Sequence, residues 1–130
     1  MKDFYDALPD EMKLAIKAAC EKKAEDLVLL DVRQSVSFTS FFVICSGNSD
    51  RQVQVIANHI EQSLKEQKAR AFNIEGYRSG NWILMDYSDF LVHVFLPETR
   101  AFYNLEGLWH DGIRIEIPDE VDGRDKSEQK

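Results

Sequence analysis

The hydrophobic and polar positions of this chain change period several times, and each change predicts an element. Over residues 9–23, apolar side chains recur every three or four positions, which is typical of an amphipathic helix lying on another element. The nearly continuous apolar run 26–32 is short enough for a buried strand. Residues 33–40 are polar and serine-rich, so they predict a loop before a second apolar strand at 41–46.

A strand, a tight turn and a helix start follow one another without a spare residue at 41–52. Ser49 and Gln52 have the spacing of a capping box. In this motif the serine hydroxyl accepts the N–H of Gln52, while the glutamine side chain reaches back to Ser49. An apolar stripe from Val53 to Leu64 then predicts a long helix that ends near residue 68.

The second half of the chain is richer in strands. The predicted elements are a weak strand at 71–75, a loop at 76–80, strands at 81–87 and 90–96, a helix from Pro97 to Trp109, and an extended segment at 113–117. The order is therefore α-β-β-α-β-β-β-α, which indicates an α/β fold with a mixed sheet and helices mainly on one face. Residues 1–118 form one domain, and the acidic tail 119–130 is expected to be disordered.

The predicted hairpin has two unlike faces. A two-residue turn at Ser88-Asp89 fixes the register of its strands. One face is apolar and should lie beneath the helices. The opposite face carries Trp82, Leu84, Asp86, Leu91, His93 and Phe95. The carboxylate and imidazole would need partners in a core, and the large apolar groups would form an exposed patch in water. Such a mixture is typical of a protein-binding face, and tryptophan is enriched at binding hot spots. The alternative is that the third helix or the tail covers this face, with Asp86 hydrogen-bonded locally.

Composition and charge narrow the classes of partner. The chain has 130 residues, 44% of them hydrophobic, and a formal net charge of −7. An acidic balance disfavours direct nucleic-acid recognition and favours a basic protein partner. Cys20 and Cys45 stand in apolar contexts without a CxxC motif and are expected to be small buried hydrophobes. No apolar run approaches the roughly 20 residues that cross a bilayer, so the cytoplasm is the expected location.

The strongest candidate for enzyme chemistry is the turn at 46–49, because a helix N-terminus can bind an anion. It contains one glycine and matches neither GxxxxGKS nor GxGxxG. Nucleotidyl transfer also needs a pair of carboxylates on Mg²⁺, and Asp26 and Asp31 are expected on opposite faces of their strand. A plain fold corner is therefore favoured, with no catalytic residue, metal or cofactor. A nucleotide-binding or nucleotidyltransferase enzyme using Ser46–Ser49 stays as the alternative.

Three stretches resemble a known family: AEDLVLLDV, SFTSFFVICSGNSDRQ and EGYRSGNWILMDYSDFLVHVFLPETRAFYNLEGLW. Together they resemble the ribosome silencing factor family, also called the Iojap or RsfS family, from residue 24 to residue 109. The resemblance implies a nucleotidyltransferase-like fold that lacks the metal carboxylates of the enzymes. It also implies a non-enzymatic translational repressor that binds the large ribosomal subunit through its basic protein number fourteen. Bound there, family members block association with the small subunit and silence ribosomes under nutrient limitation.

The resemblance also points to a contact surface, because the family's tryptophan after the EGY loop corresponds to Trp82. The candidate partner-binding residues are Trp82, Leu84, Asp86, Tyr87, Leu91, His93 and Tyr77. The sequence departs from the family at Asn81, and at Ser88 where many members have glycine, which makes a type II′ turn less certain. A homodimer through the same face when the protein is free is a further hypothesis.

Overall fold

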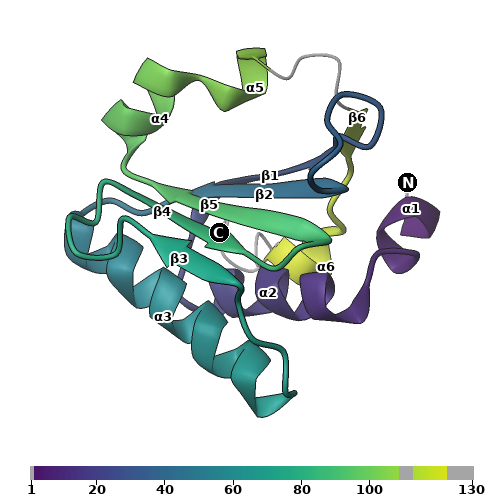
Figure 1. The fold of residues 1–130 in the computed structure, drawn as a ribbon, viewed down its shortest axis with the longest axis horizontal. Helices are drawn as coiled ribbons and strands as arrows, with labels where there is room; N and C mark the ends of the chain where they lie inside the picture. Colours follow the sequence, from purple (N-terminus) through teal and green to yellow (C-terminus); the bar gives the residue numbers. More distant parts are fainter. Residues whose placement is uncertain (1, 109–112, 123–130) are drawn as a thin grey trace, which may run out of the picture.

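The computed structural model describes residues 2–108 and 113–122, and Figure 1 shows a single sheet with helices on both sides. The strands are β1 (Glu25–Asp31), β2 (Phe41–Ser46), β3 (Asn73–Glu75), β4 (Trp82–Asp86), β5 (Phe90–Phe95) and β6 (Ile113–Ile115). The helices are α1 (Lys2–Asp6), α2 (Asp10–Glu21), α3 (Asp50–Glu66), α4 (Pro97–Tyr103), α5 (Leu105–Leu108) and α6 (Asp119–Asp122).

The sheet is mixed, in the order β3-β4-β5-β2-β1-β6. Its central neighbours β2 and β5 are parallel, and the other described pairs are antiparallel. Helices α2, α3 and α6 lie on one face, while α4 and α5 lie over the other (Figure 1). The prediction of an α/β fold with a mixed sheet is therefore confirmed.

The element order is more complex than the prediction. The short lead before Pro9 forms α1, in which Tyr5 is buried and Phe4 is exposed. The extended segment at 113–117 forms β6, which pairs with β1. Within the tail that was expected to be disordered, Asp119–Asp122 form the helix α6, while residues 123–130 lie outside the described part.

The third predicted helix is broken, which corrects the sequence prediction. It was expected to run from Pro97 to Trp109, but α4 ends at Tyr103. Asn104 adopts the left-handed conformation (φ 48°, ψ 59°), which terminates a helix, and a second short helix, α5, follows. Trp109 lies outside the described residues.

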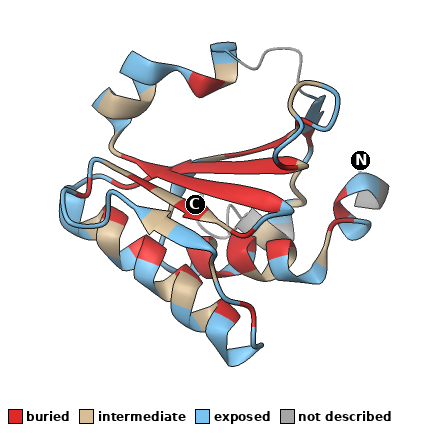
Figure 2. Cartoon of the chain, in the orientation of Figure 1, coloured by how far each residue is buried: buried red, intermediate tan, exposed pale blue. Residues whose placement is uncertain are grey.

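The core lies between the sheet and the helices α2 and α3. Each helix presents an apolar stripe to the sheet, including the fully buried Met12 and Ile56. The hairpin has the predicted register, with Ile83 opposite Val94 and Met85 opposite Val92. Those four side chains are completely buried on this face. Figure 2 shows β2 and β5 in the red of buried residues.

The corner between β2 and α3 has the predicted N-cap with one difference. The Ser49 hydroxyl accepts the N–H of Gln52 at 3.0 Å, as expected. The Gln52 side chain does not reach back to Ser49. Its carbonyl oxygen accepts the N–H of Asn48 at 2.7 Å, and its Nε2 points to the carbonyl oxygens of Lys22 and Lys23. Gln52 thus ties the start of α3 to the end of α2.

No helix in the described part of the chain is long and apolar enough to span a bilayer.

Candidate functional site

The sheet face opposite α2 and α3 carries a second, smaller hydrophobic cluster. Its buried members are Val28, Leu30, Val32, Phe42, Ile44, Leu91, Phe95 and Leu105, and the partly buried Val36, Trp82 and Leu84 pack against them. Leu105 comes from α5, which lies over this face with α4 (Figure 1). The alternative that the third helix covers the mixed face is therefore correct for part of it, while Trp82 and Leu84 are only half-buried.

Trp82 lies in an aromatic stack at the margin of this cluster. Its ring stacks on Phe95 with 4.9 Å between centroids, and the ring of Tyr103 from α4 lies against it at 4.8 Å. The indole Nε1 donates a hydrogen bond to Nδ1 of His93 at 3.2 Å. Because an indole N–H can only donate, His93 Nδ1 must be the acceptor, which places the imidazole proton on Nε2.

His93 is a buried and neutral residue rather than a surface group. Only 4% of it is exposed, and burial lowers its pKa from 6.5 to about 3. Its ring meets the ring of Phe42 edge-on at 4.9 Å. Nε2 has no hydrogen-bond partner among the described residues. The buried His93 therefore orients the indole of Trp82 through its hydrogen bond to Nε1.

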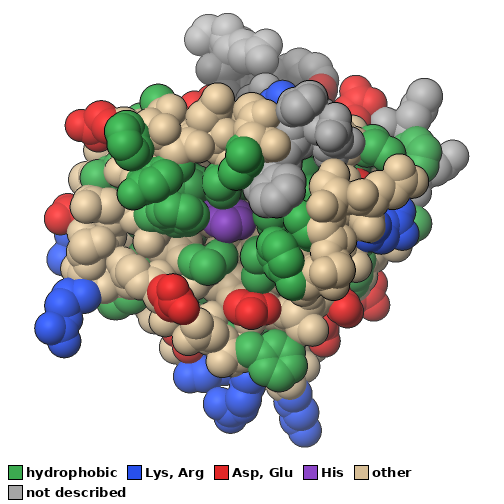
Figure 3. Space-filling view, turned by 45° about the horizontal axis from the view of Figure 1, so that its top comes forward, with side chains coloured by type: hydrophobic (Ala, Val, Ile, Leu, Met, Phe, Trp, Pro, Cys, Tyr) green, Lys and Arg blue, Asp and Glu red, His purple; other side chains and the backbone are tan. Residues whose placement is uncertain are grey.

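The outer margin of the site is acidic. Asp86 ends β4, is partly exposed, and accepts the N–H of Ser88 at 2.8 Å, the kind of local bond that the alternative required. Figure 3 views the α4 side and shows hydrophobic side chains gathered around a histidine, with acidic side chains close by. An apolar centre with a carboxylate at its rim is typical of protein-binding surfaces.

Five of the seven predicted site residues share this face: Trp82, Leu84, Asp86, Leu91 and His93. Two do not. Tyr87 lies in the opposite core with 8% of its surface exposed, and burial raises its pKa to about 12. Tyr77 is exposed in the loop after β3, where its backbone carbonyl accepts a hydrogen bond from Gln54 of α3 at 2.8 Å.

Tyr103 is the site residue that the sequence reasoning missed. The apolar positions Phe102, Leu105 and Leu108 do not share one buried face: only Leu105 is buried, and Phe102 and Leu108 are 80% and 64% exposed. The break at Asn104 changes the direction of the chain and leaves Tyr103 against Trp82. Asparagine tolerates the left-handed conformation, and this was the signal available in the sequence.

The backbone N–H groups in and after the turn at 46–49 donate to acceptors within the protein. The N–H of Gly47 donates to the Phe95 carbonyl at 2.9 Å, and that of Asn48 to the Gln52 side chain. The N–H of Arg51 donates to the Asp50 carboxylate at 2.7 Å. These donors are not free for a phosphate, whereas a phosphate-binding corner points them at its ligand.

Other groups needed for enzyme chemistry are not assembled in this part of the chain. The described residues contain no cluster of three or more His, Cys, Asp or Glu side chains that could hold a metal ion. Cys45 is completely buried, and burial raises its pKa to about 12, so its sulfur stays protonated near neutral pH.

Comparisons with known proteins point to one family. A family model described as "Ribosomal silencing factor during starvation" matches residues 5–130. A ribosomal silencing factor from Halalkalibacterium halodurans is 42% identical over 106 residues, covering 82% of this chain and 91% of the relative. A crystal structure of a Chromobacterium violaceum protein superimposes with a TM-score of 0.76 at 36% identity, covering 84% of this chain and 88% of the other. The mouse protein named "Mitochondrial assembly of ribosomal large subunit protein 1" is 29% identical over 102 residues, covering 76% of this chain and 45% of the relative.

Proposed function

Because this chain belongs to the ribosomal silencing factor family, we propose that it represses translation by binding the large ribosomal subunit through protein number fourteen. Bound there, it occludes the surface that meets the small subunit. The observation that carries the proposal is the family match over residues 5–130. The name of the mouse relative, which refers to assembly of the large subunit, supports that subunit as the target.

The contact surface is the Trp82 face, which we define as Trp82, Leu84, Asp86, Leu91 and Tyr103. A half-buried tryptophan beside aliphatic groups is a typical hot spot, because it is already partly desolvated and ordered before binding. Asp86 and the net charge of −7 complement a basic ribosomal protein and set the register of docking. Steric occlusion requires only tight and well-placed binding, so the protein acts without catalysis.

The decisive experiment is sedimentation of purified ribosomal subunits with and without the protein. Saturating protein should keep the two subunits apart and should migrate with the large one. If the subunits associate fully in its presence, the proposed function is wrong.

The Trp82→Ala variant tests the location of the contact. It should keep the native circular dichroism spectrum and lose binding to the large subunit, because the central anchor of the face is removed. Phe4→Ala is the matched control, since it truncates an aromatic residue that is 67% exposed on α1, a helix that lies away from α4 (Figure 1). A Trp82→Ala protein that is folded and binds normally would contradict the assignment of this face, and so would one that unfolds.

A further inference from the structure

The segment α4–α5 is held to the body by few apolar contacts. Helix α4 has no buried residue, and α5 contributes only Leu105. Nevertheless Tyr103, at the end of α4, lies with its ring 4.8 Å from that of Trp82. An exposed helix of seven residues is too short to be stable alone, so other contacts must fix its position.

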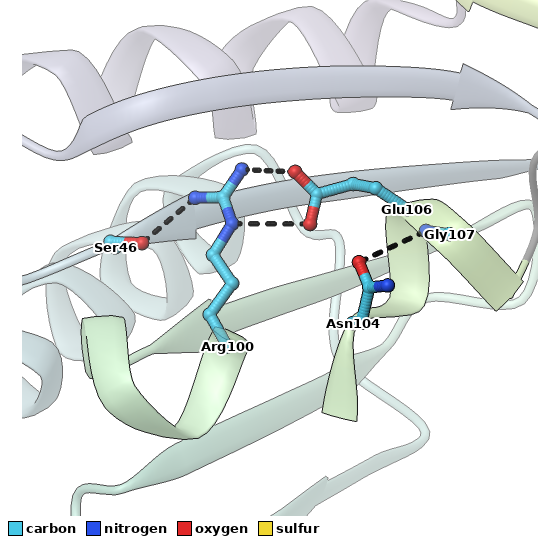
Figure 4. A network of polar contacts seen from close by, with 5 residues as sticks. All are labelled: Ser46, Arg100, Asn104, Glu106 and Gly107. Atoms are coloured by element: carbon cyan, nitrogen blue, oxygen red, sulfur yellow. Dashed lines mark hydrogen bonds and ion pairs between the residues drawn. The ribbon is translucent and has the colours of Figure 1, made fainter. Parts of the chain in front are cut away.

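Those contacts converge on the guanidinium of Arg100, whose side chain is only 11% exposed. Its Nη2 and Nε donate to the two carboxylate oxygens of Glu106 in α5, at 2.8 and 3.3 Å. Its Nη1 donates to the hydroxyl of Ser46, at the end of β2, at 2.8 Å (Figure 4). We call these three residues the Arg100 clamp. It joins α4, α5 and the central sheet through one planar group that carries several N–H donors.

The bend at Asn104 brings Glu106 of α5 close to Arg100 of α4. Asn104 adopts φ 48°, and its N–H donates to the Arg100 carbonyl at 2.8 Å. Its side-chain oxygen accepts the N–H of Gly107 at 3.2 Å (Figure 4). The chain therefore folds back after Tyr103 and presents Glu106 to Arg100. The same bend leaves Tyr103 beside Trp82.

We propose that the Arg100 clamp is a positioning device that fixes α4 on the sheet and so pre-organises Tyr103 against Trp82 before the partner binds. The inference rests on the proposed function, because it concerns the affinity of the Trp82 face. Arg100 is a positioning residue and not a contact residue, since its charge is directed inward to Ser46 and Glu106. A face that is already ordered binds more tightly, because less conformational entropy is lost in the complex.

The primary test compares Arg100→Ala with the wild-type protein in binding to isolated large ribosomal subunits. We expect binding to weaken about tenfold, which corresponds to about 1.4 kcal/mol. Arg33→Ala is the matched control, because Arg33 forms a similar paired contact with Asp31 (2.7 and 3.0 Å) while its side chain is 63% exposed. Its binding should be unchanged.

A second readout separates positioning from general stability. The protein is labelled with fluorinated tryptophan, and the Trp82 resonance is assigned by its loss in Trp82→Phe. In free Arg100→Ala the Trp82 resonance should shift, because Tyr103 no longer lies against the indole, and in Arg33→Ala it should not. The double variant Arg100→Glu, Glu106→Arg restores an ion pair of opposite polarity and should return part of the lost affinity. Glu106→Gln replaces Arg100→Ala if the latter does not fold.

Several outcomes would overturn the inference. One is an Arg100→Ala protein that binds like the wild type, or whose Trp82 resonance is unchanged. Another is a charge-reversed double variant that binds no better than Arg100→Ala. If Trp82→Ala loses binding while Arg100→Ala does not, the clamp is wrong and the proposed function stands. If the wild-type protein does not bind the large subunit, the proposed function fails, and the Trp82 resonance still shows whether the clamp positions Tyr103.

Discussion

At the scale of single residues, the hydrogen bond between Trp82 and His93 orients the indole at the candidate site. His93 accepts the indole N–H and remains neutral, with its Nε2 proton unpaired among the described groups. A buried donor without an acceptor costs about 1–3 kcal/mol. The fold tolerates this cost at His93, whose imidazole orients Trp82, the residue that we propose as the centre of the binding face.

The buried imidazole predicts a specific dependence of stability on pH. The His93 pKa is about 3 in the folded protein and near the ordinary 6.5 in the unfolded chain. Between these values the unfolded state binds a proton that the folded state does not. The free energy of unfolding should therefore fall as the pH falls below the ordinary value, by up to about 1.4 kcal/mol per pH unit. His93→Gln removes this contribution while keeping a polar side chain.

Urea denaturation of the wild-type protein and His93→Gln between about pH 7 and about pH 5 measures the effect. The difference in unfolding free energy between the two proteins should change with pH. The carboxyls of Glu21, Asp31 and Glu106 have pKa values lowered by hydrogen bonds to His59, Arg33 and Arg100, so their stabilisation is lost only at more acidic pH. A difference that stays constant across this range would show that His93 is not buried in the neutral form.

At the scale of elements, the corner between β2 and α3 also connects the start of α3 to the end of α2. Gln52 satisfies the N–H of Asn48 and reaches the carbonyls that end α2. Gln62 lies on the same helix and is exposed. Substituting Gln52 and Gln62 in turn therefore distinguishes the hydrogen bonds of Gln52 from the helix propensity of glutamine, which both substitutions change.

We predict that Gln52→Ala lowers the free energy of unfolding by about 1–2 kcal/mol, because it leaves the Asn48 N–H and two helix-end carbonyls without their partner. Gln62→Ala should change it by no more than about 0.5 kcal/mol, as is usual for an exposed position. Urea denaturation with a shared slope measures both values. Equal effects of the two substitutions would contradict the role assigned to Gln52.

The elements also show how far the sequence predicts this fold. The two-residue turn at Ser88-Asp89 predicted the register of β4 and β5, and period-two alternation then assigned Trp82 and His93 to one face. Alternation does not say what covers a face. What covers the Trp82 side of the sheet depends on Asn104. This residue lies within a helical pattern, adopts the left-handed conformation and ends α4. The burial of His93 and the contact of Tyr103 follow from tertiary packing and could not be predicted from local pattern.

At the scale of the whole molecule, the sheet has two faces with different roles. One is sealed by α2 and α3 and supplies the main core, so that substitutions there act through stability. The other is covered in part by α4–α5 and leaves Trp82 accessible at its margin. The strand–turn–helix corner is the most recognisable stretch of the sequence, yet its polar groups are used within the fold. We therefore propose the Trp82 face, rather than this corner, as the contact surface.

The net charge of −7 leads to a last prediction, for the kinetics of binding to the large subunit. An acidic protein should be attracted by a basic ribosomal protein and repelled by the surrounding ribosomal RNA. If protein number fourteen dominates the approach, salt should slow association, because it screens the attraction. Asp86→Asn should reduce this dependence, since Asp86 is part of the Trp82 face. Asp10→Asn makes the same change of charge at a fully exposed side chain on α2, so it should leave the dependence largely intact.

Stopped-flow association measured across a range of salt concentrations distinguishes attraction by the basic ribosomal protein from repulsion by the ribosomal RNA. Slower association at higher salt, with a smaller slope for Asp86→Asn than for Asp10→Asn, is the expected result. Faster association at higher salt would mean that repulsion by RNA governs the approach, and equal slopes for the two variants would mean that Asp86 lies outside the contact. Either result would contradict charge complementarity at the Trp82 face, even if the protein still kept the subunits apart.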